Sequence, residues 1–195
     1  AAAAATMADS KSGEDWPTSP EEYQLVKKIG QGAFARVYVA RCAAKNCEVA
    51  IKVMDLEKVT SNLDHLRQEV MTMKLCRHKN VLPLYTSFSV KRELWLVMPY
   101  MDKGSMLEAM RQLKNAGRSA GLDESWIAAI LHETCQGLQY LHASGWVHRD
   151  IKAGNILINS KGDVMLSDFG VAGILTNPDP MSQENNRNTF VGTPC

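Results

Sequence analysis

Two aspartates and one asparagine are the residues of this sequence that are best placed to do chemistry. Asp150, the last residue of a His-Arg-Asp tripeptide, lies five positions before Asn155, and Asp168 begins an Asp-Phe-Gly tripeptide after the apolar run 156–158. This order places one candidate base and two metal-binding side chains around a single cleft, which is the layout of a phosphoryl-transfer site. The alternative is that Asp150 and Asp168 are ordinary loop carboxylates that cap turns.

A lysine and a glutamate nearer the N-terminus could supply further charge to such a site. Lys52 lies in the largely apolar run 49–54, which predicts a β-strand with Ala50 and Lys52 on one face. A lysine inside such a strand needs a partner. The segment from residue 61 predicts a helix with Glu69 beside its apolar stripe. We therefore expect a Lys52–Glu69 pair, with a solvated surface Glu69 as the alternative.

A glycine loop precedes this strand. Gly30 and Gly32 lie between the predicted strands 23–29 and 36–41. Without a Cβ atom they let backbone N–H groups come close to phosphate oxygens. A dinucleotide-binding fold would need a helix after the glycines, whereas the residues from Val37 onward alternate as in a strand, which disfavours that fold. An ordinary hairpin turn is the remaining alternative.

Further strands follow, and then a linker. Residues 82–90 and 93–98 predict two strands joined by a short turn. Pro99 ends the second strand, because proline cannot donate a ladder hydrogen bond in a central strand. Residues 99–104 form a linker, so we place a lobe boundary there.

The region after the linker predicts two helices and a hairpin. Ser105 and Glu108 form a capping box that begins the first helix. The second helix is capped near Asp123. Its predicted buried stripe consists of Ile127, Ile130, Leu131, Leu138 and Leu141. The hairpin 156–167 then presents Asp168 at its end.

Composition narrows the class of protein. The chain has 195 residues, of which 45% are hydrophobic and 22% charged, the usage of an ordinary globular domain. A formal net charge of +1 excludes a strongly basic nucleic-acid surface, and no apolar run approaches the roughly 18 residues of a membrane span. The five cysteines form no Cys-x-x-Cys pair, which argues against a zinc site or a disulfide framework. We expect a cytoplasmic protein in a reducing compartment that binds neither nucleic acid nor a membrane.

The N-terminal residues 1–19 are small, polar and interrupted by proline, and they show no periodicity. We therefore expect a disordered lead. Trp16 is the exception, because a lone aromatic beside a domain either packs onto that domain or stays exposed, and the sequence leaves both alternatives open.

Together these motifs resemble a eukaryotic protein kinase from about residue 20 to the end. The motifs that carry the resemblance are Gly30-x-Gly32 with Val37, 49–52, Glu69, 148–150, Asn155, 168–170 and 192–194. Lys152 after the His-Arg-Asp tripeptide is typical of the serine/threonine type. Within that type, 94–98, 104–105, 148–157 and 189–195 are similar to the sterile-20-like, germinal-centre-kinase group. The segment 16–23 and Ala35, which replaces the third glycine of the loop, resemble its oxidative-stress-responsive and proline-alanine-rich branch.

The resemblance implies an α+β, bilobal protein-kinase fold. A β-rich N-lobe with one regulatory helix would span 20–98, a hinge 99–104, and an incomplete helical C-lobe 105–195. Family members continue past the Gly-Thr-Pro-Cys sequence with further helices, so we expect a C-terminally truncated fragment that ends in the activation segment. Much of the apolar stripe of the second C-lobe helix would then face water.

The same resemblance implies an ATP site between the lobes. The residues expected to line it are Ile29, Gly30, Gln31, Gly32, Ala33, Phe34, Ala35, Arg36, Val37, Ala50, Lys52, Met98, Met101 and Leu157. Val37, Ala50 and Leu157 would sandwich the adenine, and Met98 would guard the back of the pocket. The backbone from residue 99 to Met101 would bond the edge of the base.

Roles in phosphoryl transfer follow from the resemblance as well. Lys52, held by Glu69, would ion-pair the α- and β-phosphates. Asp168 and Asn155 would hold Mg²⁺, for which Mn²⁺ can substitute, because these ions need hard oxygen ligands. Asp150 would accept or orient the hydroxyl proton of a protein serine or threonine. Lys152 would neutralise the transferring group, so that catalysis rests on positioning and electrostatics.

The resemblance finally implies control by phosphorylation. Thr189 would be the activating site, modified by an upstream kinase and received by Arg149. Thr193 would be structural and would bond Asp150 and Lys152. The bland alternative is that Thr189 is one hydroxyl in a disordered loop.

A non-catalytic nucleotide-binding or scaffolding protein is the rival interpretation of the whole chain. Such proteins tend to lose one or more of four residues, namely Lys52, Asp150, Asn155 and Asp168. All four are present, which favours the enzyme.

Overall fold

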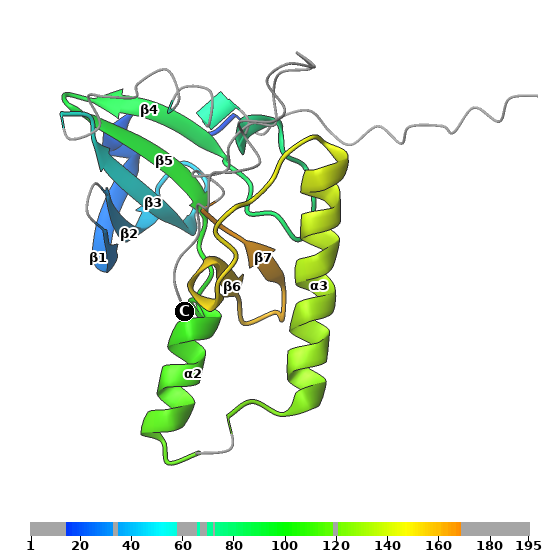
Figure 1. The fold of residues 1–195 in the computed structure, drawn as a ribbon. Coiled ribbons are helices and arrows are strands. Elements are labelled where there is room, and N and C mark those ends of the chain that lie inside the picture. Colours follow the sequence, from blue (N-terminus) through cyan, green and yellow to red (C-terminus); the bar gives the residue numbers. More distant parts are fainter. Residues whose placement is uncertain are drawn as a thin grey trace, which may run out of the picture.

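The computed structural model describes residues 15–32, 35–57, 66, 70, 71, 73–118 and 121–168. Within these residues a five-stranded sheet forms one lobe, and two long helices with a small hairpin between them form the other (Figure 1). The predicted α+β architecture, with a β-rich first lobe and a helical second lobe, is therefore confirmed.

The sheet of the first lobe is antiparallel throughout, in the order β1-β2-β3-β5-β4. Its strands are β1 (Tyr23–Gln31), β2 (Ala35–Cys42), β3 (Cys47–Asp55), β4 (Thr86–Val90) and β5 (Glu93–Pro99). Four of them, β1, β2, β3 and β5, lie where the alternating pattern predicts them, with ends that extend slightly further. Pro99 is the last residue of β5, as predicted.

The alternation along β3 separates two packed faces. One face joins aromatic side chains of β4 and β5 in a core that includes Val49, Ile51, Val53, Phe88 and Trp95. Ala50 and Lys52 lie on the opposite face, because successive side chains of a strand point to opposite sides. This is the face that bears the site described below, and the predicted orientation of Lys52 is confirmed.

Part of the predicted helix after β3 lies within the described residues. Leu66, Val70 and Met73 are helical and buried, and they pack in the core that also includes Leu84 and Leu96. Their spacing matches the predicted apolar stripe. Glu69 lies outside the described residues.

The strand predicted over 82–90 begins later than expected. The structure has β4 starting at Thr86, and the Leu82 N–H donates to the Leu166 carbonyl of the second lobe instead (2.9 Å). Pro83 cannot donate a ladder hydrogen bond, which explains why the sheet does not extend through it. Residues 81–85 therefore connect the lobes.

The helix α2 (Met106–Asn115) begins at the predicted cap. The Glu108 N–H donates to Ser105 Oγ (3.2 Å), which satisfies one of the donors left open at a helix start. The Glu108 carboxylate accepts from Gln112 along the helix (3.3 Å). The cap at Ser105 is thus confirmed, with the glutamate side chain turned along the helix.

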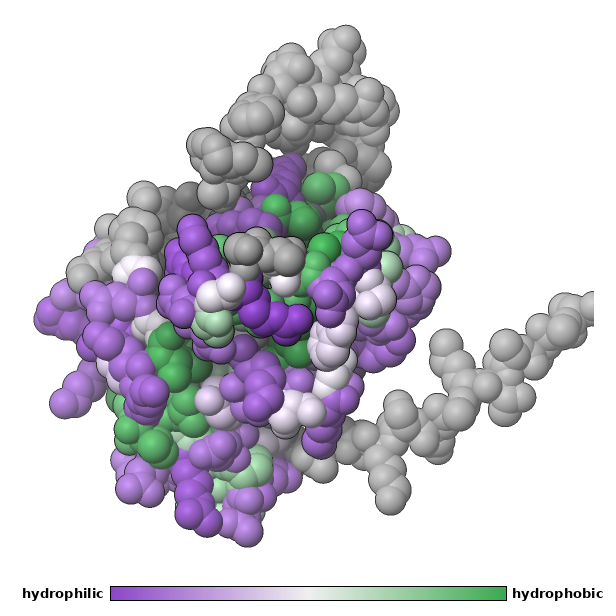
Figure 2. Space-filling model, turned by 90° about the horizontal axis from the view of Figure 1, so that it is seen from below, coloured by the Kyte–Doolittle hydropathy of each residue, from purple (hydrophilic) through white to green (hydrophobic). Residues whose placement is uncertain are grey.

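The helix α3 (Glu124–Ala143) begins after Asp123, as predicted, but only part of its predicted stripe is buried. The buried residues of α3 are Ile130, Thr134, Gly137 and Leu141, and Gly137 lies against Leu166 of the second-lobe hairpin. Ile127 and Leu131 are 41% and 52% exposed, which corrects the prediction of a fully buried stripe and agrees with the expectation that much of it faces water. Seen from below, the surface carries apolar areas among hydrophilic ones (Figure 2).

A two-stranded hairpin lies between α2 and α3 (Figure 1). It consists of β6 (Ile156–Ile158) and β7 (Val164–Leu166), and it follows the 3₁₀ turn η2 (Ala153–Asn155). The Asn159 side chain closes its turn by accepting from the Asp163 N–H (2.9 Å). The predicted hairpin is confirmed, and it ends two residues before Asp168.

The lead into the sheet is ordered closer to the N-terminus than predicted. The Trp16 ring stacks on Tyr85, with centroids 4.1 Å apart and planes 5° from parallel, and the Tyr23 hydroxyl donates to the Pro17 carbonyl (2.8 Å). Trp16 and Pro17 therefore contact the first lobe, which corrects the disordered lead predicted over 1–19 at these two residues. Residues 1–14 lie outside the described part of the chain. No helix in the described residues has the length and apolar character needed to cross a membrane.

Candidate active site

The centre of the site is an ion pair between the two lobes. Lys52 Nζ of β3 donates to Asp168 Oδ1, which follows β7. The two residues are 116 positions apart in sequence, so the contact exists only because the sheet face and the hairpin meet. Glu69, the predicted partner of Lys52, lies outside the described residues, and the Lys52–Glu69 pair stays a prediction.

A second group of polar side chains surrounds Asp150. Asp150 Oδ2 accepts from Lys152 Nζ (2.7 Å) and from Asn155 Nδ2 (3.0 Å), and Asn155 Nδ2 also donates to the Asp150 carbonyl (2.9 Å). The Asp150 side chain is 17% exposed. Three residues predicted from the sequence to act together are therefore in direct contact. A carboxylate held this way has a fixed orientation, which a base needs in order to meet an incoming hydroxyl.

The Asn155 backbone joins this group to the ion pair. Asn155 is 5% exposed, and its carbonyl accepts from the Ser167 N–H (2.9 Å) and the Ser167 hydroxyl (3.3 Å). Ser167 immediately precedes Asp168. The position of Asp168 is therefore tied to the loop that carries Asp150.

Two residues of the site have left-handed backbone conformations. Arg149 has φ 62° and Asp168 has φ 54°, a region that residues other than glycine adopt infrequently. Such conformations persist where surrounding contacts determine them, and they cluster at functional sites. Here they turn the chain directly before Asp150 and directly after Ser167.

His148 is buried beneath this loop. It is 1% exposed, its Nδ1 accepts from the Asp150 N–H (3.3 Å), and its Nε2 lies 3.0 Å from the Ser167 carbonyl. A backbone N–H can only donate and a carbonyl can only accept, so the ring carries its proton on Nε2. Burial lowers the pKa of His148 below its ordinary value, although the Ser167 hydrogen bond and the nearby aspartates oppose the shift. The histidine is thus a neutral support that holds both ends of the site.

The residues predicted to sandwich adenine come from neighbouring strands. Val37 lies opposite Lys52 in the β2–β3 register, and Ala50 lies opposite Met98 in the β3–β5 register. Ala50 and Met98 are buried, at 8% and 6% exposure. Gly30 lies beside Val37, where an added Cβ atom would meet the valine Cβ at the ordinary contact distance of 3.4 Å. The register therefore brings these residues together on the face that bears Lys52.

The linker after β5 is hydrogen-bonded to the hairpin. The Lys103 N–H donates to the Ile158 carbonyl (3.2 Å), and the Ser160 N–H donates to Asp102 Oδ1 (2.7 Å). This hydrogen bond, more than the nearby Lys103, lowers the pKa of the Asp102 carboxyl. An antiparallel bridge joins Ser105 and Leu157. Leu157, predicted to lie against the adenine, is thus held to the linker whose backbone is predicted to bond the edge of the base.

Asp102 was missed by sequence reasoning. Its type is ordinary in a linker, and its partner lies 58 positions away, so no local pattern could have indicated the bond. The sequence signal available was an aspartate in a turn.

Asn80 was also missed. Its side-chain amide donates to Glu133 Oε2 of α3 (2.8 Å) and to the Val164 carbonyl of β7 (2.9 Å). The backbone carbonyl of Asn80 accepts from the Leu166 N–H (2.9 Å). Lys79 and Asn80 bonds lower the pKa of Glu133. Asn80 is 2% exposed. It therefore joins α3 to β7, the strand that leads to Asp168.

The described residues include most of the predicted ATP-site positions. The ATP-site positions that are partly or fully exposed to solvent are Ile29, Gly30, Gln31, Gly32, Ala35, Arg36, Val37 and Leu157. Arg149 is half-buried beside Asp150. The predicted residues Ala33, Phe34, Glu69, Thr189 and Thr193 lie outside the described part of the chain.

The side chains present fit a hard divalent cation. Asn155 Nδ2 is used by Asp150, which fixes the orientation of the amide and leaves Oδ1 as its acceptor atom. The Asp168 side chain is 51% exposed and adjoins Ser167, which is bonded to Asn155. Carboxylate and amide oxygens are the ligands that Mg²⁺ and Mn²⁺ prefer.

The site contains a cation from one lobe and a set of oxygen ligands and a held carboxylate from the other. A phosphate placed against Lys52 would lie near Asp168, and a hydroxyl near Asp150 would meet an oriented acceptor. This arrangement supports the transfer of a phosphoryl group.

Comparison with known proteins agrees with this geometry. The family profile described as "Protein kinase domain" matches residues 23–195. The chain is 45% identical over 186 residues to "Germinal center kinase 3" of Caenorhabditis elegans, 41% over 183 residues to "Serine/threonine-protein kinase fray2" of Dictyostelium discoideum, and 41% over 172 residues to "Serine/threonine-protein kinase shk1/pak1" of Schizosaccharomyces pombe.

These alignments cover 92%, 93% and 88% of the chain, but only 31%, 17% and 24% of the respective relatives. The chain thus spans less than a third of the length of these relatives. The family match covers nearly all of the chain and includes every described residue of the site. The chain therefore belongs to the protein kinase domain family, with relatives that include a germinal center kinase.

Proposed function

We propose that the protein is a serine/threonine protein kinase, which transfers the γ-phosphate of ATP to serine or threonine hydroxyls of other proteins. The observation that carries this proposal is the convergence of Lys52, Asp168, Asn155 and Asp150 from three segments of the chain. A scaffold that binds partners alone has no need of this convergence. The relatives fray2 and shk1/pak1 are named as serine/threonine-protein kinases, which supports the same class of acceptor.

The nucleotide would lie between the lobes. Val37 and Ala50 would cover the adenine from above and Leu157 from below, while Met98 closes the back. The Met101 backbone would bond the edge of the base. The adjacency of these positions in the strand register and the hydrogen bonds from the linker to the hairpin support this placement.

The phosphates would be held by Lys52 and by a divalent cation. Asp168 and Asn155 would hold the cation, Mg²⁺ or Mn²⁺, which when bound neutralises phosphate charge. In the structure Lys52 contacts Asp168 directly, so nucleotide binding requires Lys52 to turn from that carboxylate toward phosphate oxygens. Glu69 would hold Lys52 in the orientation in which its ammonium group meets the phosphates.

Transfer would then depend on Asp150 and Lys152. Asp150 orients the acceptor hydroxyl and accepts its proton as the hydroxyl oxygen bonds to the γ-phosphorus and the bond to the β-phosphate oxygen breaks. Lys152, which is 2.7 Å from Asp150, stabilises the charge of the transferring group. Removing one such positioned base lowers turnover by about 10²–10⁴-fold.

The test is the replacement Lys52→Met. We expect transfer to a generic basic protein to be lost and Mg·ATP affinity to fall, because the phosphates lose their cation, while the fold stays intact. Lys27→Met, at an exposed lysine of β1, is the matched control and should keep the parent rate. Transfer by Lys52→Met at the parent rate would show that the assignment is wrong.

Control by phosphorylation forms the second part of the proposal. Thr189 would be phosphorylated by an upstream kinase, and Arg149, which adjoins Asp150, would receive the phosphate. Thr193 would bond Asp150 and Lys152. We expect Thr189→Ala to block activation by the upstream kinase, and Arg149→Ala to blunt it even when Thr189 is phosphorylated. Full activation of Thr189→Ala, measured as substrate phosphorylation, would refute this part alone.

The cellular setting completes the proposal. The protein would act in the cytoplasm, in an intracellular signalling cascade that includes stress signalling, on protein substrates and under an upstream kinase. Similarity to the germinal center kinase and to fray2 supports the germinal-centre-kinase group. Within that group we propose the oxidative-stress-responsive and proline-alanine-rich branch.

A further inference from the structure

Two cysteines face each other across the turn between β2 and β3. Cys42 and Cys47 are direct partners in the antiparallel register, and both are thiols. They close the four-residue turn 43–46, in which the Asn46 N–H donates to the Ala43 carbonyl (3.3 Å). Opposed residues of an antiparallel pair put their side chains on the same face of the sheet.

The spacing of this pair suits a disulfide. Opposed Cα atoms of antiparallel strands lie about 4.5–5.5 Å apart, within the roughly 4.4–6.8 Å that disulfides span. A third side chain fixes the pair from β1, because Tyr23 lies opposite Cys42 in the β1–β2 register. Tyr23 is 4% exposed, and its phenol has a pKa raised first by burial and then by Cys42 and Cys47. Both thiols therefore lie against the same ring.

The two thiols differ in their access to solvent. Cys42 is fully buried at 0% exposure, whereas Cys47, at the first position of β3, is partly exposed. An oxidant in solution therefore meets Cys47 first. The sulfur of Cys42 is then the neighbour that can attack the oxidised product.

We propose that Cys42 and Cys47 are a peroxide-oxidisable dithiol that closes to a disulfide across the β2–β3 turn. The Cys-x₄-Cys spacing does not by itself indicate a disulfide, and the strand register is what shows that the two cysteines are opposed. This modification site lies outside the nucleotide and catalytic residues, and it is independent of the function proposed above.

The oxidation balances with hydrogen peroxide as the oxidant. Cys47 loses its proton to water, and its thiolate attacks one peroxide oxygen; the O–O bond breaks, which leaves a Cys47 sulfenic acid and a hydroxide that takes up a proton. Cys42 sulfur then attacks Cys47 sulfur, the S–O bond breaks, and the Cys42 proton leaves with the hydroxide as water. Two electrons pass from the two thiols to one peroxide, and two waters form.

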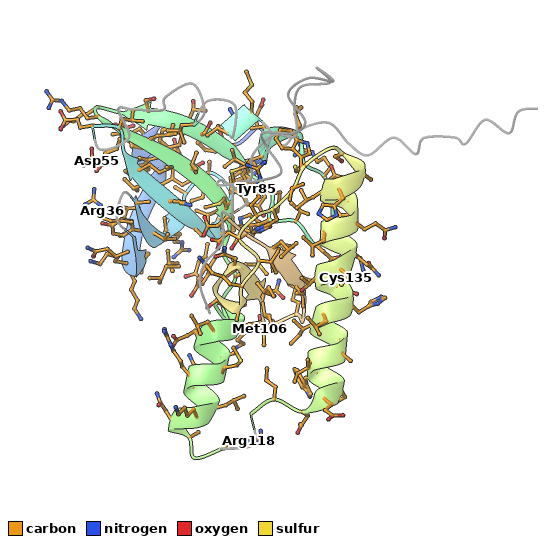
Figure 3. All side chains as sticks on the ribbon, in the orientation of Figure 1. Arg36, Asp55, Tyr85, Met106, Arg118 and Cys135 are labelled. Atoms are coloured by element: carbon orange, nitrogen blue, oxygen red, sulfur yellow. The ribbon has the colours of Figure 1, made fainter. Side chains whose placement is uncertain are left out.

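The other described cysteines lack this arrangement. Cys76 is 5% exposed, and burial raises the pKa of its thiol, which disfavours the reactive thiolate. Cys135 is exposed but lies on α3 in the other lobe (Figure 3). Neither is opposed to a second cysteine within the described strands. Cys135 is therefore the matched control for the pair.

Peptide mapping tests the proposal directly. The protein is treated with hydrogen peroxide at low concentration, denatured, alkylated and digested with trypsin. Trypsin cuts after Arg41, Lys45 and Lys52, so Cys42 and Cys47 fall on separate peptides that stay together only through a disulfide. We expect a linked 42–45/46–52 pair that disappears on reduction, in a monomer whose mass has fallen by two hydrogen atoms. Of the five thiols, three remain available for alkylation after two are oxidised.

Variants and a second probe complete the test. Cys135→Ser should form the linked pair as the parent does, and Cys47→Ser should lose it entirely. Phenylarsine oxide, which binds two neighbouring thiols without oxidation, should protect two thiols of the parent and of Cys135→Ser from alkylation, but none of Cys47→Ser. Oxidation of Cys47 to a sulfinic acid without linkage, or linkage that involves any other cysteine, would overturn the proposal.

Discussion

The two halves of the site are positioned by different kinds of interaction. In the sheet half, Lys52 and Ala50 belong to a regular strand, and their places follow from a register that pairs residues 49–54 of β3 with both neighbouring strands. In the loop half, Asp150 and Asp168 belong to no strand or helix. Their places follow from a few side-chain bonds and from left-handed backbone at Arg149 and Asp168.

This difference predicts how each half responds to mutation. A strand residue keeps its place when its side chain changes, because the backbone ladder holds it. A loop residue held by individual hydrogen bonds moves when one partner is lost, since buried polar groups left unpaired are costly. Substitutions in the sheet half should therefore remove only the group replaced, whereas those in the loop half should also disturb their neighbours.

The largest expected effect concerns the two aspartates of the loop half. Asp150→Asn should lower turnover by about 10²–10⁴-fold, the usual loss on removing a positioned base. Mg·ATP affinity should stay near that of the parent, because the new asparagine keeps a side-chain oxygen and a backbone carbonyl that can accept from Asn155 Nδ2. Asp168→Asn should weaken Mg·ATP affinity itself, because a charged oxygen ligand is lost. Nucleotide titration and steady-state transfer rates of both variants measure the two effects separately.

The control for this pair is Asp163→Asn, at an exposed carboxylate of the hairpin turn outside the site. It should keep both parameters of the parent. Equal Mg·ATP affinities for the two aspartate variants would remove the division of roles between Asp150 and Asp168.

A smaller effect on stability is expected at two glycines, Gly30 in the sheet half and Gly137 in the helix that packs behind the loop half. A Cβ atom on Gly137 of α3 would lie 2.6 Å from the Asn80 carbonyl oxygen, whereas a Cβ on Gly30 would meet Val37 at 3.4 Å, an ordinary contact. Gly137→Ala gains about 1 kcal/mol of helix propensity, but the 2.6 Å contact with a backbone oxygen places its overpacking cost in the upper part of the usual range, at about 2–3 kcal/mol. We expect net destabilisation of about 1–2 kcal/mol for Gly137→Ala and a small stabilisation, about 0.5 kcal/mol, for Gly30→Ala.

Denaturant unfolding of both variants measures these changes. Because the Asn80 carbonyl also accepts from the Leu166 N–H, Gly137→Ala should in addition weaken Mg·ATP binding through the strand that leads to Asp168. A Gly137→Ala protein as stable as the parent would show that the Asn80 carbonyl gives way, and that the loop half is less rigid than its hydrogen bonds indicate.

The same division explains how much of the fold the sequence could predict. Alternation places Lys52 on the correct face of β3, and Ser105 begins α2, because these features depend on neighbouring residues alone. Periodicity along α3 identifies an apolar side but cannot say what covers it. The side that packs on β7 is instead the one with Thr134 and Gly137, since small residues let the helix approach the strand.

The site follows the same rule. The motifs predict which residues carry the chemistry, and Asp150, Lys152 and Asn155 are in contact as expected. The residues that hold the site in place, Asp102 and Asn80, could not be predicted, because they form hydrogen bonds with residues far away in sequence. Their types are common in turns, so only the folded chain distinguishes them from ordinary surface residues.

The last expected effect, which appears only when the pH is lowered, comes from His148, the residue that holds both ends of the loop half. Burial lowers its pKa in the folded protein, whereas in the unfolded chain it titrates near the ordinary value of about 6.5. As the pH falls through that value, His148 binds a proton in the unfolded state but not in the folded state. The free energy of unfolding then falls with a slope of at most about 1.4 kcal/mol per pH unit. The contribution is fully present above about pH 7.5.

The measurement compares the pH dependence of unfolding free energy, between pH 8 and pH 5, in the parent, in His148→Gln and in His142→Gln, an exposed control. The His148 variant should show a shallower decline than the other two, because its side chain no longer binds a proton on unfolding. NMR of the parent gives an independent reading, in which the His148 ring stays neutral below the pH at which an ordinary histidine titrates. A His148 ring that becomes protonated near pH 6.5 would mean that the Asp150 N–H and the Ser167 carbonyl do not fix its tautomer. The loop half would then lack the buried support that ties Asp150 to Asp168.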